Sequence, residues 1–346
     1  MNNHEKYIQR CLDLAINAKG HVAPNPMVGC VIVYNDKIIG EGYHLAFGKA
    51  HAEVNAINNV KDKSLLNRST LYVNLEPCTH HGKTPPCADL IIKHNIPNVI
   101  IGTVDIYNEV AGKGIEKLKN AGIHVTVDVL KDKCLALNKE FFVFHQKKRP
   151  FITLKWAQSS DGFIYNPKLK DNWITNDLSK QLVHQWRAHH KAILVGYNTV
   201  LNDNPYLTVR LVKGKNPIRI VFDKFLDLNK KFNIFNTDAE TLILNYKSSH
   251  QDKNLTYLKV DSKNELNDLF AYCYQQGISS IFVEGGTKIL QKFIAAGCWD
   301  EAFVFSGNRT FKDGLKAPVI QGTLVNTKTI GSDILNIYKN ESIKQL

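Results

Sequence analysis

Three residues that can bind a metal ion, His51, Cys78 and Cys87, occur in one stretch together with an acidic residue, Glu53. One imidazole and two thiolates form a tetrahedral zinc site whose fourth position is left for water, which is typical of catalytic rather than structural sites. Zinc lowers the pKa of such a water from about 15.7 to roughly 7, so a nucleophile is available at neutral pH. A proton must then reach the leaving group, and the spacing places Glu53 for that role.

The order of these residues is typical of zinc-dependent nucleobase deaminases, in which His-x-Glu is followed by Pro-Cys-x-x-Cys. His51-Ala52-Glu53 fits this pattern and Pro77 precedes Cys78, but Cys87 follows Cys78 by nine positions instead of three. The longer insert adds polar residues that could line a substrate pocket: His80, His81, Lys83 and Thr84. The stretch therefore predicts hydrolytic deamination of a small molecule.

Other interpretations of the same residues remain open. The two cysteines could be buried thiols or a disulfide, and His80 or His81 could replace one of them as a ligand. We favour Cys87, because it follows two prolines at a predicted helix start, where the helix dipole stabilises a thiolate. A purely structural zinc protein would need a fourth protein ligand and would have no use for Glu53.

The composition is that of a globular protein with room for two domains. The chain has 346 residues, 44% of them hydrophobic and 22% charged. No apolar run is long enough to span a membrane and the first residues lack an apolar signal core, so we expect a cytoplasmic protein with no membrane partner. The net charge of +12 is spread along the chain without a basic block, so we expect no nucleic-acid partner.

The elements that position the zinc ligands alternate between strands and helices. Apolar periodicity and turn residues predict this order for the first half: helix 4–19, strands 27–34 and 37–43, helix 51–60, strand 71–75, helix 86–94, strand 99–104, helix 112–121, strand 124–129 and helix 135–145. This order predicts an α/β sheet with helices on both faces. Both parts of the metal motif then fall at helix starts beside strand ends.

A polar, basic run at 146–150, which ends in Pro150, separates this half from a second α/β series. The expected domains are 1–146 and 150–346. The second half is predicted to contain strand 151–156, helix 177–188, strands 192–195, 218–222 and 241–245, helix 266–276, strand 280–284, a helix to 296, and strands 301–305 and 333–338. Its Glu284-Gly285-Gly286-Thr287 turn, between strand and helix, is suited to binding a phosphate, although such a turn alone is a weak signal.

With both halves in view, the chain resembles the bifunctional deaminase/reductase family of riboflavin biosynthesis over nearly its whole length. The matching segments of the first half are 21–29, 40–44, 51–54, 75–78 and 84–87. Those of the second half are 154–155, 160–162, 173–175, 204–210 and 283–286. The resemblance implies a cytidine-deaminase-like three-layer domain followed by a dihydrofolate-reductase-like domain.

The resemblance also implies two consecutive reactions. The first is zinc-dependent deamination of 2,5-diamino-6-ribosylamino-4(3H)-pyrimidinone 5′-phosphate, and the second is reduction of the ribosyl group of the product to ribityl by NADPH. Glu53 would move the proton in the first reaction, while Asn25, His44, His81 and Lys83 would hold the substrate. We expect a homo-oligomer whose partner is this small phosphorylated pyrimidine.

The resemblance assigns the second reaction to two further groups of residues. Those expected to face the substrate are Lys155, Asp171, Arg187, Leu207, Arg210 and Glu284. Those expected to contact NADPH are Ala157, Trp173, Thr199, Asp203, Gly285 and Gly286.

The second half departs from the family pattern at two places, which leaves its reductase activity open to an alternative interpretation. The usual Asp-Ser-x-Leu is replaced by Asp223-Lys224-Phe225-Leu226, and 306–309 reads Ser-Gly-Asn-Arg where Ala-Pro-Lys-Leu is typical. A deaminase joined to a non-catalytic binding module is therefore the alternative function. A deaminase of free nucleosides or tRNA would instead have the short cysteine spacing and a basic tail.

Overall fold

The computed structural model describes residues 3–79, 85–105 and 111–340, and the chain divides into two compact units, Met1–Lys148 and Arg149–Leu346. Each unit has its own sheet and hydrophobic core. The predicted domain limits of 1–146 and 150–346 lie within two residues of this division. No helix among the described residues is both long enough and apolar enough to cross a bilayer.

The first unit contains these elements: α1 (Asn3–Ala15), η1 (Ile16–Ala18), β1 (Gly29–Tyr34), β2 (Lys37–Tyr43), α2 (Ala52–Asn59), η2 (Lys63–Arg68), β3 (Thr70–Val73), α3 (Cys87–Lys93), β4 (Asn98–Ile101), α4 (Lys113–Asn120), β5 (His124–Thr126), α5 (Lys131–Leu137) and α6 (Lys139–Lys147). In the described residues of this unit the strands form one five-stranded sheet in the order β2-β1-β3-β4-β5. Strands β3, β4 and β5 are parallel, while β1 is antiparallel to both β2 and β3.

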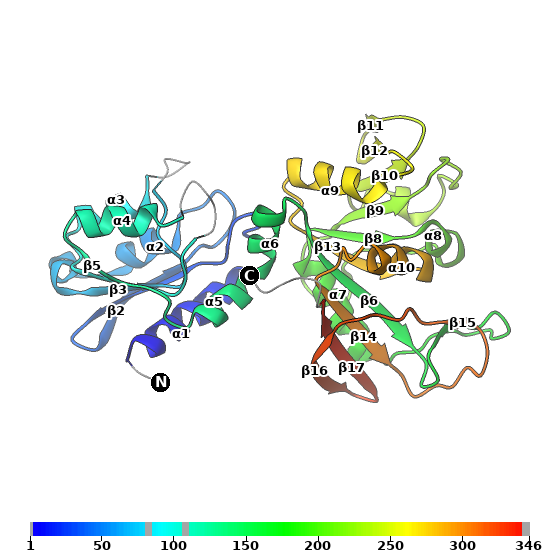
Figure 1. Cartoon of the computed structure of the whole chain (residues 1–346), viewed down its shortest axis with the longest axis horizontal. Coiled ribbons are helices and arrows are strands. Elements are labelled where there is room, and N and C mark those ends of the chain that lie inside the picture. The colour runs from blue at the N-terminus through cyan, green and yellow to red at the C-terminus, as the bar shows by residue number, and fades with distance from the viewer. Residues whose placement is uncertain (1–2, 80–84, 106–110, 341–346) are drawn as a thin grey trace. The chain divides into compact units, whose positions relative to one another are not determined.

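Two helical layers cover the two faces of this sheet, with α2, α3 and α4 on one face and α1 and α5 on the other (Figure 1). Cys30 and Ile32 of β1 pack in the core beneath α2, α3 and α4, whereas Val31 and Val33 pack against α1 and α5. Because successive residues of a strand point to opposite faces, one short apolar strand supports both layers. The predicted three-layer α/β arrangement is confirmed.

The second unit contains these elements: β6 (Phe151–Gln158), β7 (Phe163–Tyr165), α7 (Asp177–His189), β8 (Ala192–Val195), α8 (Tyr197–Asp203), β9 (Ile218–Phe222), η3 (Asn233–Phe235), β10 (Thr241–Asn245), β11 (His250–Asp252), β12 (Leu255–Lys259), α9 (Glu265–Gln275), β13 (Ser280–Gly285), α10 (Thr287–Ala295), β14 (Glu301–Ser306), β15 (Leu315–Lys316), β16 (Thr323–Ile330) and β17 (Asp333–Lys339). Its large sheet has ten strands among the described residues, in the order β11-β12-β10-β9-β8-β13-β6-β14-β17-β16.

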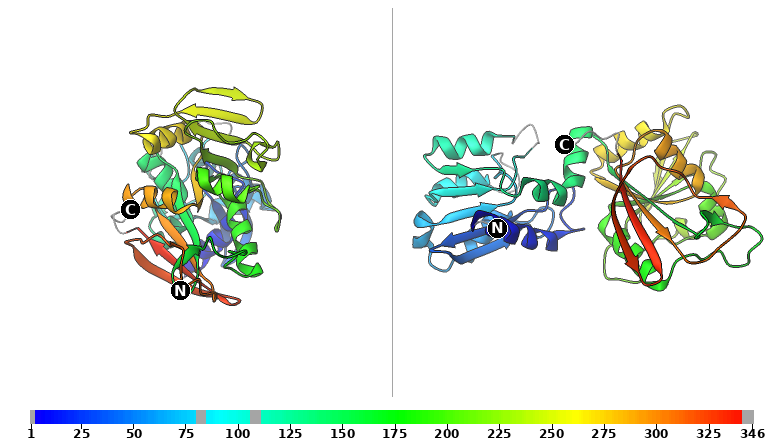
Figure 2. Two further views of the ribbon diagram at one scale, coloured as in Figure 1. Left: turned by 90° about the vertical axis from the view of Figure 1, so that its right-hand side faces the viewer. Right: turned by 60° about the horizontal axis from the view of Figure 1, so that its bottom comes forward.

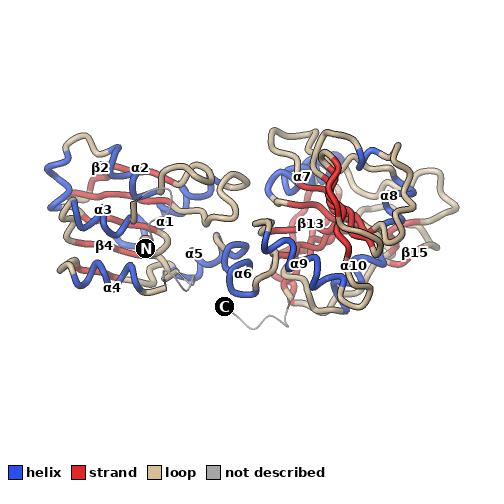
Figure 3. Tube along the Cα trace, turned by 90° about the horizontal axis from the view of Figure 1, so that it is seen from above, coloured by secondary structure: helices blue, strands red, loops and turns tan. Residues whose placement is uncertain are grey.

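The strands from β12 to β14 in this order are parallel, and antiparallel strands stand at both edges, including the β16–β17 hairpin drawn in red in Figure 2. Helices α7 and α8 cover one face of the sheet, and α9 and α10 cover the other (Figure 3). In open sheets of this type, ligands bind beyond the carboxyl ends of the parallel strands. The loops after β8, β9 and β13 are therefore where a cofactor is expected.

Some predicted elements differ from the structure. The helix predicted at 135–145 is two helices, because the Asn138 side chain between them hydrogen-bonds both backbone groups of Met27, with distances of 2.8 and 2.9 Å. The strand predicted at 124–129 ends at Thr126. Strand β16 was not expected, because nearly all of its residues are exposed and it has no apolar alternation.

Candidate functional site

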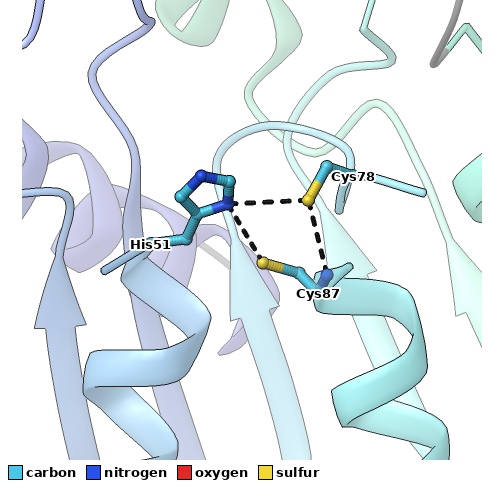
Figure 4. Close-up of side chains that lie close together, drawn as sticks. All are labelled: His51, Cys78 and Cys87. Atoms are coloured by element: carbon cyan, nitrogen blue, oxygen red, sulfur yellow. Dashed lines mark hydrogen bonds between the residues drawn. The ribbon is translucent and has the colours of Figure 1, made fainter. Parts of the chain in front are cut away.

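The three predicted metal ligands lie together at the carboxyl edge of the first sheet (Figure 4). His51 is the residue before α2, Cys78 lies on the loop after β3, and Cys87 is the first residue of α3. The Nδ1 atom of His51 is 3.3 Å from Cys87 Sγ and 3.5 Å from Cys78 Sγ. All three ligand atoms lie within 4.8 Å of one another, and they form the possible metal site found among the described residues.

This donor set fits zinc. With Zn–N near 2.0–2.1 Å and Zn–S near 2.3 Å, tetrahedral geometry separates a ligand nitrogen from a ligand sulfur by about 3.5 Å. The His51–Cys78 and His51–Cys87 distances agree with that value. Zinc coordination would leave one position open, because the described cluster supplies three ligand atoms. His80, His81 and Lys83 lie outside the described residues.

Hydrogen bonding prepares Cys78 to act as a thiolate ligand. The Cys87 backbone N–H donates to Cys78 Sγ at 3.4 Å. Interaction with the Cys87 side chain, and then with His51, lowers the pKa of Cys78 to about 4 despite partial burial. The same contact, together with burial, raises the pKa of Cys87. Cys78 is therefore the more acidic of the two thiols, and zinc binding would also require the loss of the Cys87 proton.

Glu53 lies in the first turn of α2, two residues after His51, and is only 4% exposed. Burial raises the pKa of its carboxyl group, and the negative charge of Cys78 adds to that effect. A carboxyl group whose pKa is raised toward neutrality both accepts and returns a proton readily. Its position beside the ligands fits the predicted proton transfer.

Two predicted substrate residues, Asn25 and His44, also line the cavity at this site, which has a volume of about 280 Å³. His44 Nδ1 is 3.1 Å from the carbonyl oxygen of Ala50, which fixes the proton on Nδ1. His44 Nε2 is therefore an acceptor, and it lies 3.3 Å from Asn25 Nδ2. Burial lowers the pKa of His44, which favours this neutral form.

Glu76 is a site residue whose role is not evident from the sequence pattern. It precedes Pro77-Cys78, is buried and lines the same cavity. Its Oε1 accepts the backbone N–H groups of Gly114 and Ile115 at 2.8 and 3.2 Å. Its Oε2 accepts those of Asp105 and Gly112 at 3.1 and 3.0 Å. This carboxylate therefore ties the Cys78 loop to the start of α4.

Phe141 and His145 of α6 also line the cavity and were not predicted as site residues. Phe141 is 8% exposed, and its ring centroid lies 4.6 Å from that of His145. Their spacing of four residues is a signal of a shared helix face. Nothing in the sequence indicates that this face meets the zinc site.

In the second unit, the predicted cofactor residues Thr199, Gly285 and Gly286 meet at one turn. Gly286, the residue before α10, has φ of 75°, and a Cβ atom there would lie 3.0 Å from Thr199 Oγ1. A side chain at this position would therefore crowd the Thr199 hydroxyl and strain the backbone. A glycine turn at a helix N-terminus leaves backbone N–H groups accessible to an anion, so this turn is compatible with a phosphate of NADPH.

Four predicted substrate residues are grouped on the sheet face beneath α7. Arg187 donates to both carboxylate oxygens of Glu284 at 2.7 Å, in a pair that is 12% and 8% exposed. Burial raises the pKa of Glu284, but the charge and hydrogen bonds of Arg187, together with the charge of Lys155, outweigh burial and lower this pKa. Lys155 lies on the neighbouring strand, and burial lowers its pKa while Glu284 opposes that change.

Arg210 joins this group through Thr208, whose hydroxyl accepts from Arg210 Nη1 at 2.8 Å and whose carbonyl accepts from Arg187 at 3.3 Å. The Arg210 backbone N–H donates to His184 Nδ1 at 3.0 Å. Burial lowers the pKa of His184 to about 4, and the nearby arginines add to the effect. His184, which was not predicted, is thus a neutral acceptor between two cations.

The remaining predicted residues surround this group less closely. Ala157 lies two residues after Lys155 on β6, and Leu207 is buried next to Thr208 with φ of 57°. Asp171 and Trp173 lie on an exposed loop that Arg309 holds through Asp171 Oδ2 at 2.9 Å and the Trp173 carbonyl at 2.6 Å. Asp203 is exposed at the end of α8.

Comparison with known families matches both halves of the chain. The model of the cytidine and deoxycytidylate deaminase zinc-binding region matches residues 1–103. The model of the RibD C-terminal domain matches residues 150–335. The first of these regions holds the zinc-ligand cluster, and the second holds the Arg187–Glu284 pair.

Individual relatives match nearly the whole chain. The riboflavin biosynthesis protein RibD of Aquifex aeolicus is 39% identical over 318 residues, which cover 90% of this chain and 88% of that protein. RibD of Escherichia coli is 36% identical over 87% of this chain and 86% of that protein. A crystal structure of the Thermotoga maritima diaminohydroxyphosphoribosylaminopyrimidine deaminase/5-amino-6-(5-phosphoribosylamino)uracil reductase, 36% identical, matches with a TM-score of 0.90 over 98% of this chain and 99% of that chain.

Proposed function

This chain belongs to the RibD family of riboflavin biosynthesis proteins, and we propose that His51, Cys78 and Cys87 hold the zinc ion of its deaminase reaction. The chain is a bifunctional enzyme, a zinc-dependent deaminase and an NADPH-dependent reductase. A non-catalytic C-terminal module is not favoured, because the reductase family model covers residues 150–335.

We assign deamination to the first unit, on 2,5-diamino-6-ribosylamino-4(3H)-pyrimidinone 5′-phosphate. Bound zinc supplies Lewis acidity that makes a water molecule nucleophilic at neutral pH. Asn25 and His44 hold the edge of the pyrimidine ring, since their polar atoms converge in the cavity beside the ligands. Glu53 accepts the proton of the attacking water and returns it to the departing amino group, which leaves as ammonia. The observation that carries this proposal is the buried Glu53 carboxyl in the same cavity as His51 and Cys78.

We assign reduction of the ribosyl group to the second unit. NADPH supplies a hydride equivalent when it is bound. The Gly285–Gly286 turn would bind one of its phosphates, because a glycine turn leaves its backbone N–H groups accessible and the α10 N-terminus favours an anion there. Lys155, Arg187 and Glu284 form a polar, partly buried surface for the sugar. Arg210 would bind the substrate phosphate, since a guanidinium group binds phosphate through two parallel hydrogen bonds.

Some properties of the working enzyme stay proposals. The substrate is a small phosphorylated pyrimidine, and we propose that nucleic acid is not a partner because the basic residues are spread along the chain. A cytoplasmic location and a homo-oligomeric state are further expectations. Cell fractionation and light scattering of the purified protein test them directly.

The decisive experiment incubates zinc-loaded protein with the diaminopyrimidinone phosphate, with and without NADPH, and follows product masses. We expect the deaminated ribosyl compound without NADPH and the ribityl compound only with it. Glu53→Gln is the control for the first step, and we expect a loss of about 10²–10⁴-fold in ammonia release, the usual contribution of a general acid–base group. No deamination by zinc-loaded wild-type protein would refute the assignment, and deamination without reduction would refute the second half of it.

A further inference from the structure

The cavity at the zinc ligands is completed by a helix that lies outside the region shared with other zinc deaminases. The zinc-binding family model ends at residue 103, whereas Phe141 and His145 of α6 line the cavity together with His44, Glu53 and Cys78. One wall of the pocket is therefore built from a part of the chain that the common deaminase region does not include.

This wall is fixed in place before any substrate binds. Asn138, at the start of α6, hydrogen-bonds both the N–H and the carbonyl of Met27, two residues after Asn25. Phe141 and Phe142 pack with Leu75, which leads into the Glu76-Pro77-Cys78 loop. The same contacts thus hold α6, the Asn25 loop and the Cys78 loop in one arrangement. This fixed position favours a role for α6 in substrate binding over a role as a loosely packed cover.

The chemistry of the substrate explains why such a wall is needed. In cytidine, the carbon that loses its amino group and the ring nitrogen that carries the sugar lie opposite each other across the ring. In the diaminopyrimidinone, the reacting C2 and the C6 that carries the ribosylamino group are both bonded to N1, so the two positions are separated by one ring atom. If the reacting carbon is held at the same place beside zinc, the sugar must leave the pocket in a different direction.

We propose that Phe141 and His145 determine substrate specificity by contacting the ribosyl group of the substrate, with the Phe141 ring against the C–H face of the sugar and His145 against a sugar hydroxyl. This inference rests on the proposed deaminase function. The cavity, at about 280 Å³, lies at the small end of the range for ligand pockets, so a substrate that fills it must touch this wall. Burial lowers the pKa of His145, and a neutral imidazole suits a hydroxyl better than a phosphate.

The test compares the whole substrate with a fragment that lacks the sugar. For wild-type protein, His145→Gln and Phe141→Leu, we would measure the KM for the ribosylated phosphate and the inhibition constant of free 2,5,6-triaminopyrimidin-4-one as a competitor. We expect each variant to raise the KM on the order of tenfold, equivalent to about 1.4 kcal/mol, while the inhibition constant of the free base changes less than about twofold. His124→Gln, at the exposed first position of β5 in the same unit, is the matched control and should change neither value.

Equal changes in both constants, or no change in either, would overturn the proposal, because contacts to the base or mere structural support would then explain the wall. Zinc content and melting temperature identify a variant that has lost its fold, and His145→Gln keeps the test valid if Phe141→Leu is such a case. Wild-type protein that cannot deaminate the ribosylated phosphate would instead refute the proposed function, so the two failures are distinguishable.

Discussion

The pKa values of two buried carboxyl groups, those of Glu53 and Glu284, are shifted in opposite directions. The two directions match different roles. Burial raises the pKa of Glu53, with the charge of Cys78 as the second cause. Glu284 is also buried, but Arg187 forms a bidentate pair with it and lowers its pKa. A carboxyl that changes protonation easily suits proton transfer, whereas one held ionised suits the orientation of a ligand.

His184 allows a pH test of the reductase site. Its folded pKa of about 4 lies below the ordinary value near 6.5, so the unfolded chain binds this proton first as the pH falls. His184 therefore contributes stability above about pH 6.5 that is lost progressively toward pH 4. We expect the melting temperature of the wild-type protein to fall more between about pH 7.5 and about pH 5 than that of His184→Asn, because this interval spans the ordinary pKa of histidine. The side-chain oxygen of the asparagine can still accept the Arg210 N–H. The other histidines are common to both proteins, so identical slopes would show that His184 does not titrate in this way.

The residues that could be predicted are those whose chemistry is rare and whose spacing is local. His51, Glu53, Cys78 and Cys87 were recognised because few other functions use these types in this order. Phe141 and His184 were not, because an aromatic or a histidine on an amphipathic helix has the same pattern whether it faces a core or a pocket. Their roles depend on which loop the helix packs against, which the local sequence does not encode.

At the scale of elements, His51 and Cys87 lie at helix starts, and Cys78 lies on a loop. Glu76 holds that loop in place. Each carboxylate oxygen of Glu76 accepts two backbone N–H groups from the segment that ends in α4. Gly114 permits this close approach, because a Cβ atom there would lie 2.2 Å from the carbonyl oxygen of Pro77. The position of Cys78 thus depends on α4, a helix that supplies no ligand.

Replacing Glu76 by Gln should weaken zinc binding without affecting the second unit. The amide group would point N–H donors at two backbone N–H groups, so two hydrogen bonds are lost and the loop must shift. Partners that orient metal ligands typically contribute about 10–100-fold to metal affinity, and we expect a loss in this range from chelator competition. Glu116→Gln, on the exposed face of α4, is the control. Unchanged zinc affinity in Glu76→Gln, with NADPH-dependent reduction intact, would mean that this carboxylate does not position the ligand loop.

Helices and buried strands were predicted better than exposed or interrupted elements. Helix α7 has clear apolar periodicity and strand β8 is a continuous apolar run, and both lie close to their expected limits. The break between α5 and α6 was missed, because Asn138 ends one helix by bonding to Met27, a partner more than a hundred residues away in sequence. Strand β16 forms by pairing with β17 through its backbone, and its exposed side chains record nothing of that pairing.

For the whole molecule, the separation into two units has a functional consequence. The residues that line the zinc cavity in the described part of the chain all belong to Met1–Lys148, while the Arg187–Glu284 pair and the Gly285–Gly286 turn belong to Arg149–Leu346. Each site is supported by its own sheet and core. A substitution in one of the two sites should therefore disable the reaction of that site and spare the other reaction, provided that the substituted unit stays folded.

Mixing two singly disabled proteins tests this independence. Glu53→Gln should block deamination alone, and Lys155→Met, which removes a buried charge at similar length, should block reduction alone. Neither protein by itself should form the ribityl product from the diaminopyrimidinone phosphate and NADPH, but an equimolar mixture should do so. The ribityl compound should appear after a lag that shortens as protein concentration rises, because the deaminated intermediate must leave one molecule and reach another. A chain carrying both substitutions, added in place of either partner, controls for residual activity. If the mixture stays inactive while each protein retains its spared reaction, the intermediate does not pass through solution, and the two sites must work together within one assembly.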